Sequence, residues 1–493
     1  MKKTFFNLFM VIALLFLLQS SAFPLSLYDG KLDFKGSIQQ TLNVKTHQDE
    51  RNIRYNSFRT TVRGEALYKI VSCPELDIQF YSLANYYYDY VLDIDSNMRY
   101  SVGKEAGRSY YNNVQRPSDS EEYLKEAYFD VKYKTFQLRL GKQLVSWGET
   151  AEARVADVIN PLNLKYIIAF PDWEDYKMGL WMARMFWRPE NWWQDMSFEF
   201  LVIPSTFIGT RVPPAGHGAY VGQSPMPLPI LPNNWFQRVL DAQRRDAPSS
   251  SWNNCEVGLR IRGYSTIGEG VDWYLSHFYT RLDSPLINGA EGQTNLLLLM
   301  LLGDTSRKVW TYPRYNSTAF CFSTTSSKLR SAIRGECAFN TSRDYNYGTA
   351  ANSVSAIKQR RLLTTALTFD RKTMVPWISD MNRNEPFSLS FTWYQYYMFD
   401  HEHNKATGEY IIGETGKDSS QTKFSFTAST TFLFSTLTTV FNIAYDTNGS
   451  RTLMPQLVYM PTFHWQFVLF YQDLNKHLDK YGSQVGLSVK YEF

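Results

Sequence analysis

The chain has 493 residues, and 51 Lys and Arg stand against 47 Asp and Glu, which gives a formal net charge of +4. Two of those lysines lie in residues 1–22, and without them the charge falls to +2, which is 4 minus 2. So small a surplus argues against a nucleic-acid-binding protein, which carries a basic face. Aromatic residues make up 16% of the chain, although its mean hydropathy is polar. This combination is typical of membrane β-barrels, in which lipid-facing and lumen-facing residues alternate.

Residues 1–22 have the pattern of a secretory signal peptide. Two lysines precede the apolar run Leu8–Leu18, and small residues follow it at Ser20–Ala22. This run, like the shorter Leu296–Leu302, falls below the roughly 20 residues that a membrane-spanning helix needs. We therefore expect cleavage near residue 22, which leaves 23–493 as one domain; a retained anchor is the alternative.

The rest of the chain repeats a pattern with a period of two. Between residues 32 and 42 the apolar or small residues Leu32, Phe34, Gly36, Ile38 and Leu42 alternate with Asp33, Lys35, Ser37, Gln39 and Thr41. Such alternation predicts a strand with one apolar face. We predict eighteen strands on this basis, at 31–45, 56–71, 75–90, 122–133, 136–147, 175–187, 194–203, 253–264, 270–281, 311–323, 328–341, 355–370, 385–399, 420–434, 437–447, 451–460, 463–472 and 483–493.

The connections between these strands alternate in length. Short ones, such as 134–135 and 435–436, follow long ones, such as 91–121 and the proline-rich 204–252, in which Trp235–Arg245 could form a helix. Short periplasmic turns and long outer loops are the outer-membrane pattern. We therefore predict an all-β fold: a transmembrane antiparallel β-barrel of about 18 strands, with 16 as the fallback, and with both termini in the periplasm.

Charged residues on the polar alternates are expected to line the lumen, because Arg or Lys facing lipid costs about 2–4 kcal/mol at mid-depth. The lumen-lining candidates are Arg59, Arg63, Glu65, Lys69, Glu126, Asp130, Arg139, Arg184, Arg260, Arg262, Arg330, Arg334 and Glu336. Arginines outnumber carboxylates in this set. Most should pair across strands and brace the wall, and the surplus should leave a positive strip for anionic groups.

The final strand carries a signal of its own. Val485, Leu487, Val489, Tyr491 and Phe493 are apolar at every second position. A strand that ends on an aromatic residue resembles the recognition signal of the outer-membrane barrel assembly machinery. We therefore expect Tyr491 and Phe493 to act in assembly, with the ring of Phe493 exposed and contributing little to packing.

Four cysteines occur in a compartment that permits disulfides. Cys321 and Cys337 fall on neighbouring predicted strands and could pair, but the favoured interpretation is that these two, Cys73 and Cys255 are ordinary small apolar residues. Their spacing matches no zinc pattern. The sequence therefore predicts no metal and no cofactor.

Several motifs are more specific than a generic barrel. They are Glu126–Tyr128, Arg139–Gln143, Trp147–Glu149, Val158–Leu162, Tyr312–Ser323 and Arg334–Glu336. Together they resemble an uncharacterised family of bacterial outer-membrane β-barrel proteins, catalogued as a domain of unknown function and distantly similar to alginate-export and specific porin barrels. The resemblance implies passage of hydrophobic or amphiphilic compounds, beside an exporter of the resistance-nodulation-division (RND) type or a periplasmic carrier.

The residues of the central motifs suggest how the loop after the fifth strand is shaped. Gly141 would permit close approach of a neighbouring strand, Trp147 and Gly148 end the strand, and Asn160-Pro161 is a turn signal. If 148–174 folds back into the barrel, Glu149, Arg154 and Asp157 come near the lumen. An ordinary outer loop is the alternative.

The sequence thus predicts an outer-membrane channel of a Gram-negative bacterium, in contact with outer-membrane lipids. The first hypothesis is an exporter or importer of hydrophobic or amphiphilic molecules, including those with anionic head groups. The alternative is an anion- or polysaccharide-selective porin, and the remote alternative is an outer-membrane hydrolase. We expect no enzymatic activity, because Ser276 and His277 are strand neighbours that point to opposite faces, and His401–His403 favours a solvated loop over a metal site.

Overall fold

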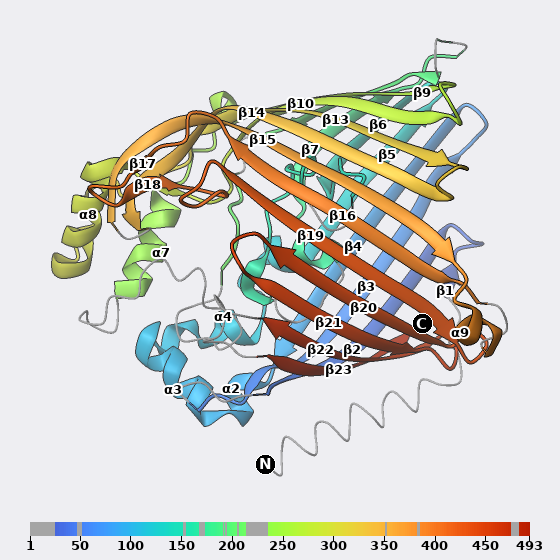
Figure 1. Ribbon diagram of the computed structural model, residues 1–493, viewed down its shortest axis with the longest axis horizontal. Coiled ribbons are helices and arrows are strands. Elements are labelled where there is room, and N and C mark those ends of the chain that lie inside the picture. Colours follow the sequence, from blue (N-terminus) through green and yellow to red (C-terminus); the bar gives the residue numbers. More distant parts are fainter. Residues whose placement is uncertain are drawn as a thin grey trace.

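The structure is a computed structural model in which one large β-barrel dominates (Figure 1). It describes residues 25–46, 52–150, 154–166, 173–190, 192, 195–204, 207–212, 235–350, 353–381, 385–474 and 483–493. The expected signal peptide and most of the proline-rich stretch 204–234 lie outside these residues. Among the described residues, no helix is long and apolar enough to cross a membrane.

The main sheet has 21 strands in the described part of the chain, and all of them pair antiparallel. Three short ones, β1 (Leu25–Leu27), β17 (His403–Asn404) and β18 (Glu409–Ile412), are attached at the ends. The other eighteen form the barrel: β2 (Leu32–Lys45), β3 (Tyr55–Ser72), β4 (Leu76–Asp89), β5 (Leu124–Tyr133), β6 (Phe136–Gln143), β7 (Leu180–Trp187), β8 (Ser197–Ile203), β9 (Glu256–Ser265), β10 (Val271–Arg281), β13 (Arg314–Ser326), β14 (Ser331–Ala350), β15 (Ser353–Thr373), β16 (Phe387–Met398), β19 (Ser420–Phe432), β20 (Leu437–Asp446), β21 (Arg451–Tyr459), β22 (Trp465–Leu474) and β23 (Gln484–Glu492).

The barrel closes between its first and last strands. β2 pairs with β23 from Ser37 opposite Glu492 to Lys45 opposite Gln484. The backbones of Gly36 and Phe493 extend this seam by two hydrogen bonds, of 2.8 and 2.9 Å. The prediction of a closed 18-stranded antiparallel barrel is therefore confirmed.

The aromatic ring at the C-terminus packs more closely than we expected. A Cβ atom placed on Gly36 would lie 2.5 Å from Cζ of Phe493, so the ring lies directly over this glycine. The centroids of the Phe34 and Phe493 rings are 6.5 Å apart. Phe493 is half-buried. The expectation that its ring contributes little to packing is wrong, because the missing side chain of Gly36 leaves a place for it.

The two faces of the strands differ as their sequence pattern predicts. Large apolar side chains stay exposed on the outer alternates, as Val62 does on β3 and Phe136, Leu138 and Leu140 do on β6. A charged residue on the other alternate, such as Arg139, faces the interior and pairs with Asp130 at 2.9 Å. An outward apolar band with a polar interior is the pattern of a membrane-spanning barrel.

The two ends of the barrel also differ (Figure 1). Short turns join the strands at the end that holds the C-terminus, with α9 (Pro376–Met381) in the longest of them. The opposite end carries long connections with α2 (Val91–Ile94), α3 (Ser96–Glu105), α4 (Tyr111–Gln115), α5 (Ser120–Tyr123), α7 (Trp235–Arg245) and α8 (Gly289–Leu302). The side chains of these connections pack into an apolar core that includes Met98, Val239 and Leu299. Helix α7 occupies the range that the sequence predicts.

Some strand boundaries differ from the prediction. β6 ends at Gln143 instead of 147, and β7 begins at Leu180 instead of 175, because the chain between them turns into the barrel. β14 continues to Ala350, nine residues past the expected end, and forms a long hairpin with β15 that extends beyond the other strands.

Cys321 and Cys337 lie on the neighbouring strands β13 and β14, but they do not pair. Cys321 is opposite Glu336 in the register, and Cys337 follows Glu336 on the same strand. The two side chains therefore project to opposite faces of the wall. All four cysteines are free.

Candidate passage through the barrel

Residues 144–150, 154–166 and 173–179 leave the wall after β6 and fold into the interior; we call them the inner segment. The chain leaves the strand close to Gly141, whose φ of +136° and close approach to β5 exclude a side chain, because a Cβ atom there would collide with the Ala127 carbonyl. The Glu126 carboxylate accepts a hydrogen bond from the backbone N–H of Leu144 at 3.0 Å. This hydrogen bond fixes the first residue of the inner segment at the point where the chain turns into the barrel.

Glu336 of β14 holds the inner segment from the opposite wall. Its carboxylate accepts hydrogen bonds from the backbone N–H of Glu149 at 2.6 Å and of Ala156 at 3.1 Å, and from Thr150 through both backbone and hydroxyl. Arg334, two residues earlier on the same face, donates to the Glu149 carbonyl at 2.8 Å and pairs with Asp370 at 2.5 Å. Two motifs that lie far apart in the sequence therefore form one contact inside the barrel.

Trp147 anchors the start of the inner segment on a second group of charges. Only 1% of its surface is exposed, and its Nε1 donates to both oxygens of Glu199 on β8 at 3.3 Å. Glu199 also pairs with Arg184 and Arg260, each at 2.6 Å. The Tyr274 hydroxyl donates to the Trp147 carbonyl at 2.7 Å. This arrangement holds the indole ring against the wall.

Asn160 joins the two ends of the inner segment. It is fully buried, and its Oδ1 accepts from the Val145 N–H at 2.7 Å, while its Nδ2 donates to the carbonyls of Gln143 and Met178 at 3.3 and 2.8 Å. The Pro161 carbonyl accepts from the Met178 N–H at 2.9 Å. The entering and leaving chains are therefore tied together by one amide.

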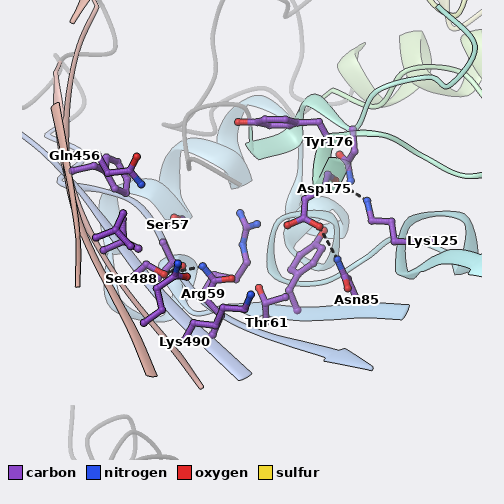
Figure 2. Close-up of a pocket in the computed structure, with 18 of the residues that line it drawn as sticks. Ser57, Arg59, Thr61, Asn85, Lys125, Asp175, Tyr176, Gln456, Ser488 and Lys490 are labelled. Carbon is purple, nitrogen blue, oxygen red and sulfur yellow. Dashed lines mark hydrogen bonds between the residues drawn. The ribbon is translucent and has the colours of Figure 1, made fainter. Parts of the chain in front are cut away.

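A cavity, which we call the passage, remains between the inner segment and the wall that β2 to β4 and β21 to β23 form. Figure 2 shows this cavity and most of the side chains that line it. Together with the solvent at its mouth, it holds about 1190 Å³ of open space. Most of the side chains around it bear hydrogen-bonding groups, among them Thr41, Ser57, Asn85, Gln456 and Ser488. Apolar side chains from β21 and β22 occupy a limited part of the wall, at Val458, Val468 and Phe470.

Three basic side chains line this passage, and two of them have acidic partners. Arg59 lies 3.6 Å from the buried Asp89, and Lys490 lies beside Glu492. Lys125 donates to the carbonyls of Asp175 at 2.7 Å and Lys177 at 3.0 Å. No carboxylate of the described residues lies within 4.0 Å of the Lys125 ammonium, so two backbone carbonyls and no ion pair hold this buried charge at the wall of the passage.

The acidic side chains of the passage are both engaged. Asp175 accepts from Asn85 at 3.0 Å, and Arg63 lies 3.7 Å away. Glu122 pairs with the buried Lys165 at 2.5 Å. The passage therefore holds one surplus positive charge among its lining residues.

Most of the expected lumen-lining residues lie on the inward alternates, and many are paired. Lys69 pairs with Asp33 at 3.0 Å, and Glu65 lines a recess at the turn end of the barrel. Arg262 is exposed near that same end, with no ion pair among the described residues. Arg330 lies in the turn between β13 and β14 with φ of +50°, and not on the strand as expected, because β14 begins one residue later. Most of the charged lumen-lining candidates therefore take part in ion pairs.

Sequence reasoning missed two charged residues of the barrel interior, Glu199 beside Trp147 and Lys125 at the passage. Glu199 lies on the polar alternate of β8, so the pattern could have revealed it. Lys125 could not be found in this way. Its neighbour Glu126 faces inward, so strict alternation would place the Lys125 side chain on the outer face. A register shift in the pairing of β4 with β5 falls between Leu124 and Glu126, and such a bulge re-aims the extra residue.

Solved structures similar in fold are outer-membrane porins. OccAB4 of Acinetobacter baumannii is 10% identical, with a TM-score of 0.51 over 94% of this chain and 98% of that one. OpdK of Pseudomonas aeruginosa with vanillate is 7% identical, with a TM-score of 0.48 over 94% and 98%. No curated protein matches the sequence.

The closed barrel with its outward apolar band, which shares its fold with OccAB4, defines an outer-membrane β-barrel with a porin fold. The profile of one family matches residues 22–476. The chain belongs to this family, described as Protein of unknown function (DUF1302), and the resemblance found in its motifs is thereby confirmed. The turn end is accordingly periplasmic, and the loop end is extracellular.

Proposed function

We propose that the protein is a diffusion channel for small polar solutes and that it weakly favours anions. The observation that carries this proposal is the lining of the passage in Figure 2. Arg59, Lys125 and Lys490 are its basic residues, Glu122 and Asp175 are its acidic residues, and most of the others are neutral hydrogen-bonding side chains. A positive, water-filled strip attracts anions and raises their local concentration.

The polar lining also bears on the competing hypothesis. A hydrophobic molecule in this passage would displace water from hydrogen-bonding side chains without replacing it, at a cost of about 1–3 kcal/mol for each buried group left unpaired. A polar solute can satisfy these groups as it moves. The passage of Figure 2 therefore supports the porin hypothesis more than it supports transport of purely hydrophobic compounds.

Two finer elements of the sequence analysis stay predictions. One is the RND-type exporter or periplasmic carrier as a partner; the other is recognition by the barrel assembly machinery.

The hydrolase hypothesis gains no support from Ser276 and His277. The Ser276 hydroxyl donates to the Ala319 carbonyl, whereas His277 lies exposed on the other face beside Thr318.

The test is the reversal potential of the purified protein in planar bilayers under a potassium chloride gradient. We expect a potential with the sign of weak anion preference. A cation-selective potential would contradict the anion preference. Proteoliposomes that fail to swell in small sugars and amino acids, together with bilayers that show no conductance steps, would contradict the channel itself.

A further inference from the structure

A second cavity lies on another side of the inner segment, apart from the passage of Figure 2. It has an open space of about 870 Å³, and its walls come from the inner segment, from 282–284 after β10, and from β13 to β16. None of its lining residues lines the passage described above. The proposed function does not use this cavity.

The walls of the second cavity differ in character. The inner segment and the start of the β10 loop provide aliphatic side chains, which are Val155, Val158, Leu162, Leu164 and Leu282. The barrel wall provides polar and aromatic side chains, among them Tyr315, Asn340, Thr364 and Tyr396. A cavity with an apolar wall and a few convergent polar groups is the usual form of a small-molecule site.

One positive charge at this cavity, that of Arg154, has no acidic partner among the residues that the structure describes. Arg343 pairs with Glu414. Arg154 instead donates Nε to the Asp157 carbonyl and Nη2 to the Asn160 carbonyl, both at 2.7 Å. Within the described part of the chain, no carboxylate lies within 4.0 Å of the Arg154 guanidinium.

The remaining acid of the cavity does little to offset that charge. Asp283 follows β10 in the extracellular connection. Because it is enclosed by protein and lies near the Glu256 carboxyl, its pKa is raised to about 8. The Asp283 side chain is therefore mostly protonated at neutral pH, and Arg154 keeps a net positive charge at the cavity.

Buried polar atoms at the cavity also lack partners in the described structure. They are Oδ1 of Asn340, whose residue is 4% exposed, Nε of Arg343 and Oε2 of Glu414. Each such group is costly to leave unpaired in a folded protein. All three belong to residues that line the cavity. The Nε of Arg343 could donate to a bound carboxylate, whereas Oδ1 of Asn340 and Oε2 of Glu414 only accept and would need a hydroxyl group or a water molecule.

We propose that the second cavity binds an anionic amphiphile, with its carboxylate at Arg154 and its apolar body against the aliphatic wall of the inner segment. A planar guanidinium suits a carboxylate. Tyr315 and Tyr396 face the body from the barrel wall. This binding site does not depend on the proposed diffusion channel, because the second cavity and the passage share no lining residue. Ions could pass through the passage while a ligand occupies the second cavity.

The experiment is calorimetric titration of the purified barrel with 4-phenylbutyrate, which carries both a carboxylate and an apolar body. Butyrate lacks the ring, and 4-phenylbutanol lacks the charge. We expect each of these two to bind about tenfold more weakly or worse, which corresponds to about 1.4 kcal/mol. Equal binding of the alcohol and the carboxylate would overturn the role of Arg154, and equal binding of butyrate would overturn the apolar wall.

Variants locate the binding. Arg154→Gln should weaken 4-phenylbutyrate about tenfold, Arg154→Lys should weaken it less, and Thr364→Phe should fill the cavity and abolish binding without removing a charge. Lys328→Gln, in the exposed turn before β14, is the matched control. Heat-modifiable migration on gels reports whether each variant is folded. Folded Thr364→Phe that still binds as the wild type does would overturn the proposal, whereas the reversal potential of the wild type tests the diffusion channel separately.

Discussion

The carboxylate of Glu336 accepts a hydrogen bond from the backbone N–H of Ala156, 180 positions earlier in the chain, at 3.1 Å. The same carboxylate binds the backbones of Glu149 and Thr150. The Arg-Gly-Glu motif of the wall and the Trp-Gly-Glu motif of the inner segment therefore act as one device. It holds a loop inside the barrel, where the loop narrows the passage.

The first prediction concerns this device. Glu336→Ala removes an acceptor of several hydrogen bonds, and bonds to a charged group are worth about 1.5–3 kcal/mol each. The inner segment should lose its fixed position, and single-channel currents in planar bilayers should become larger and noisier. Asp344→Ala, on the part of β14 that extends beyond the other strands, is the control. Wild-type currents from folded Glu336→Ala would show that the inner segment does not depend on this residue.

The second prediction removes the inner segment itself. Deletion of 150–170 leaves Trp147 and the wall intact but takes away Thr150 and residues 154–166, which occupy the lumen. A barrel of this strand number encloses a wide interior once nothing fills it, so single-channel conductance should rise. Removal of the β17–β18 hairpin (403–412), in another extracellular connection, should raise it less. Unchanged conductance after deletion of 150–170 would mean that the constriction lies elsewhere.

The third prediction concerns ion preference. Lys125 is the basic residue of the passage without a carboxylate partner in the described structure. A unit charge acts on an ion 4 Å away with about 1 kcal/mol in water, so Lys125→Gln should lower the ratio of anion to cation permeability several-fold. The measurement is the reversal potential in a salt gradient, with Lys328→Gln as the control in the periplasmic turn. If both variants keep the wild-type potential, Lys125 does not set the selectivity.

The fourth prediction concerns Phe493 and Gly36. The ring of Phe493 packs on Gly36 and completes the β2–β23 seam, so Phe493→Ala should leave the closure weaker. We expect less heat-modifiable barrel in the outer membrane, and Phe493→Tyr should assemble normally because it keeps the ring. Gly36→Leu should also lower assembly, since its side chain would displace the ring. Full assembly of both Phe493→Ala and Gly36→Leu would show that this contact is dispensable.

The fifth prediction concerns pH and rests on the second cavity. The pKa of Asp283 is raised to about 8, and its charged neighbours are Glu256, Arg154 and Arg343. The Asp283 side chain is neutral at pH 6 and becomes negative as the pH rises through 8, so it then opposes an anion at Arg154. Binding of 4-phenylbutyrate should therefore be weaker at pH 9.5 than at pH 6, as calorimetry would show. Asp283→Asn should remove most of this difference, and a pH dependence that persists in this variant would exclude Asp283 as its source.

Much of the fold could be predicted from local patterns. The alternation from Leu32 to Leu42 and along the other strands has a period of two. A strand that points an Arg or Lys side chain toward lipid loses about 2–4 kcal/mol of stability at mid-depth. These short-range rules determined the strands, their inward and outward faces and the sorting of short turns and long loops. The motifs Trp147–Glu149 and Arg334–Glu336 likewise identified the family, but the sequence did not tell what they do to each other.

What only the tertiary structure decided depends on contacts between residues far apart in the chain. The contact of Glu336 with Ala156 exists because the inner segment crosses the lumen, and no local pattern records that path. Lys125 faces the passage because of a bulge, which shifts the alternation by one residue and is invisible in a period of two. Phe493 is packed and half-buried because barrel closure brings Gly36 beneath its ring. Alternation specifies which way a side chain points along a regular strand, whereas irregular backbone and long-range closure determine what it meets.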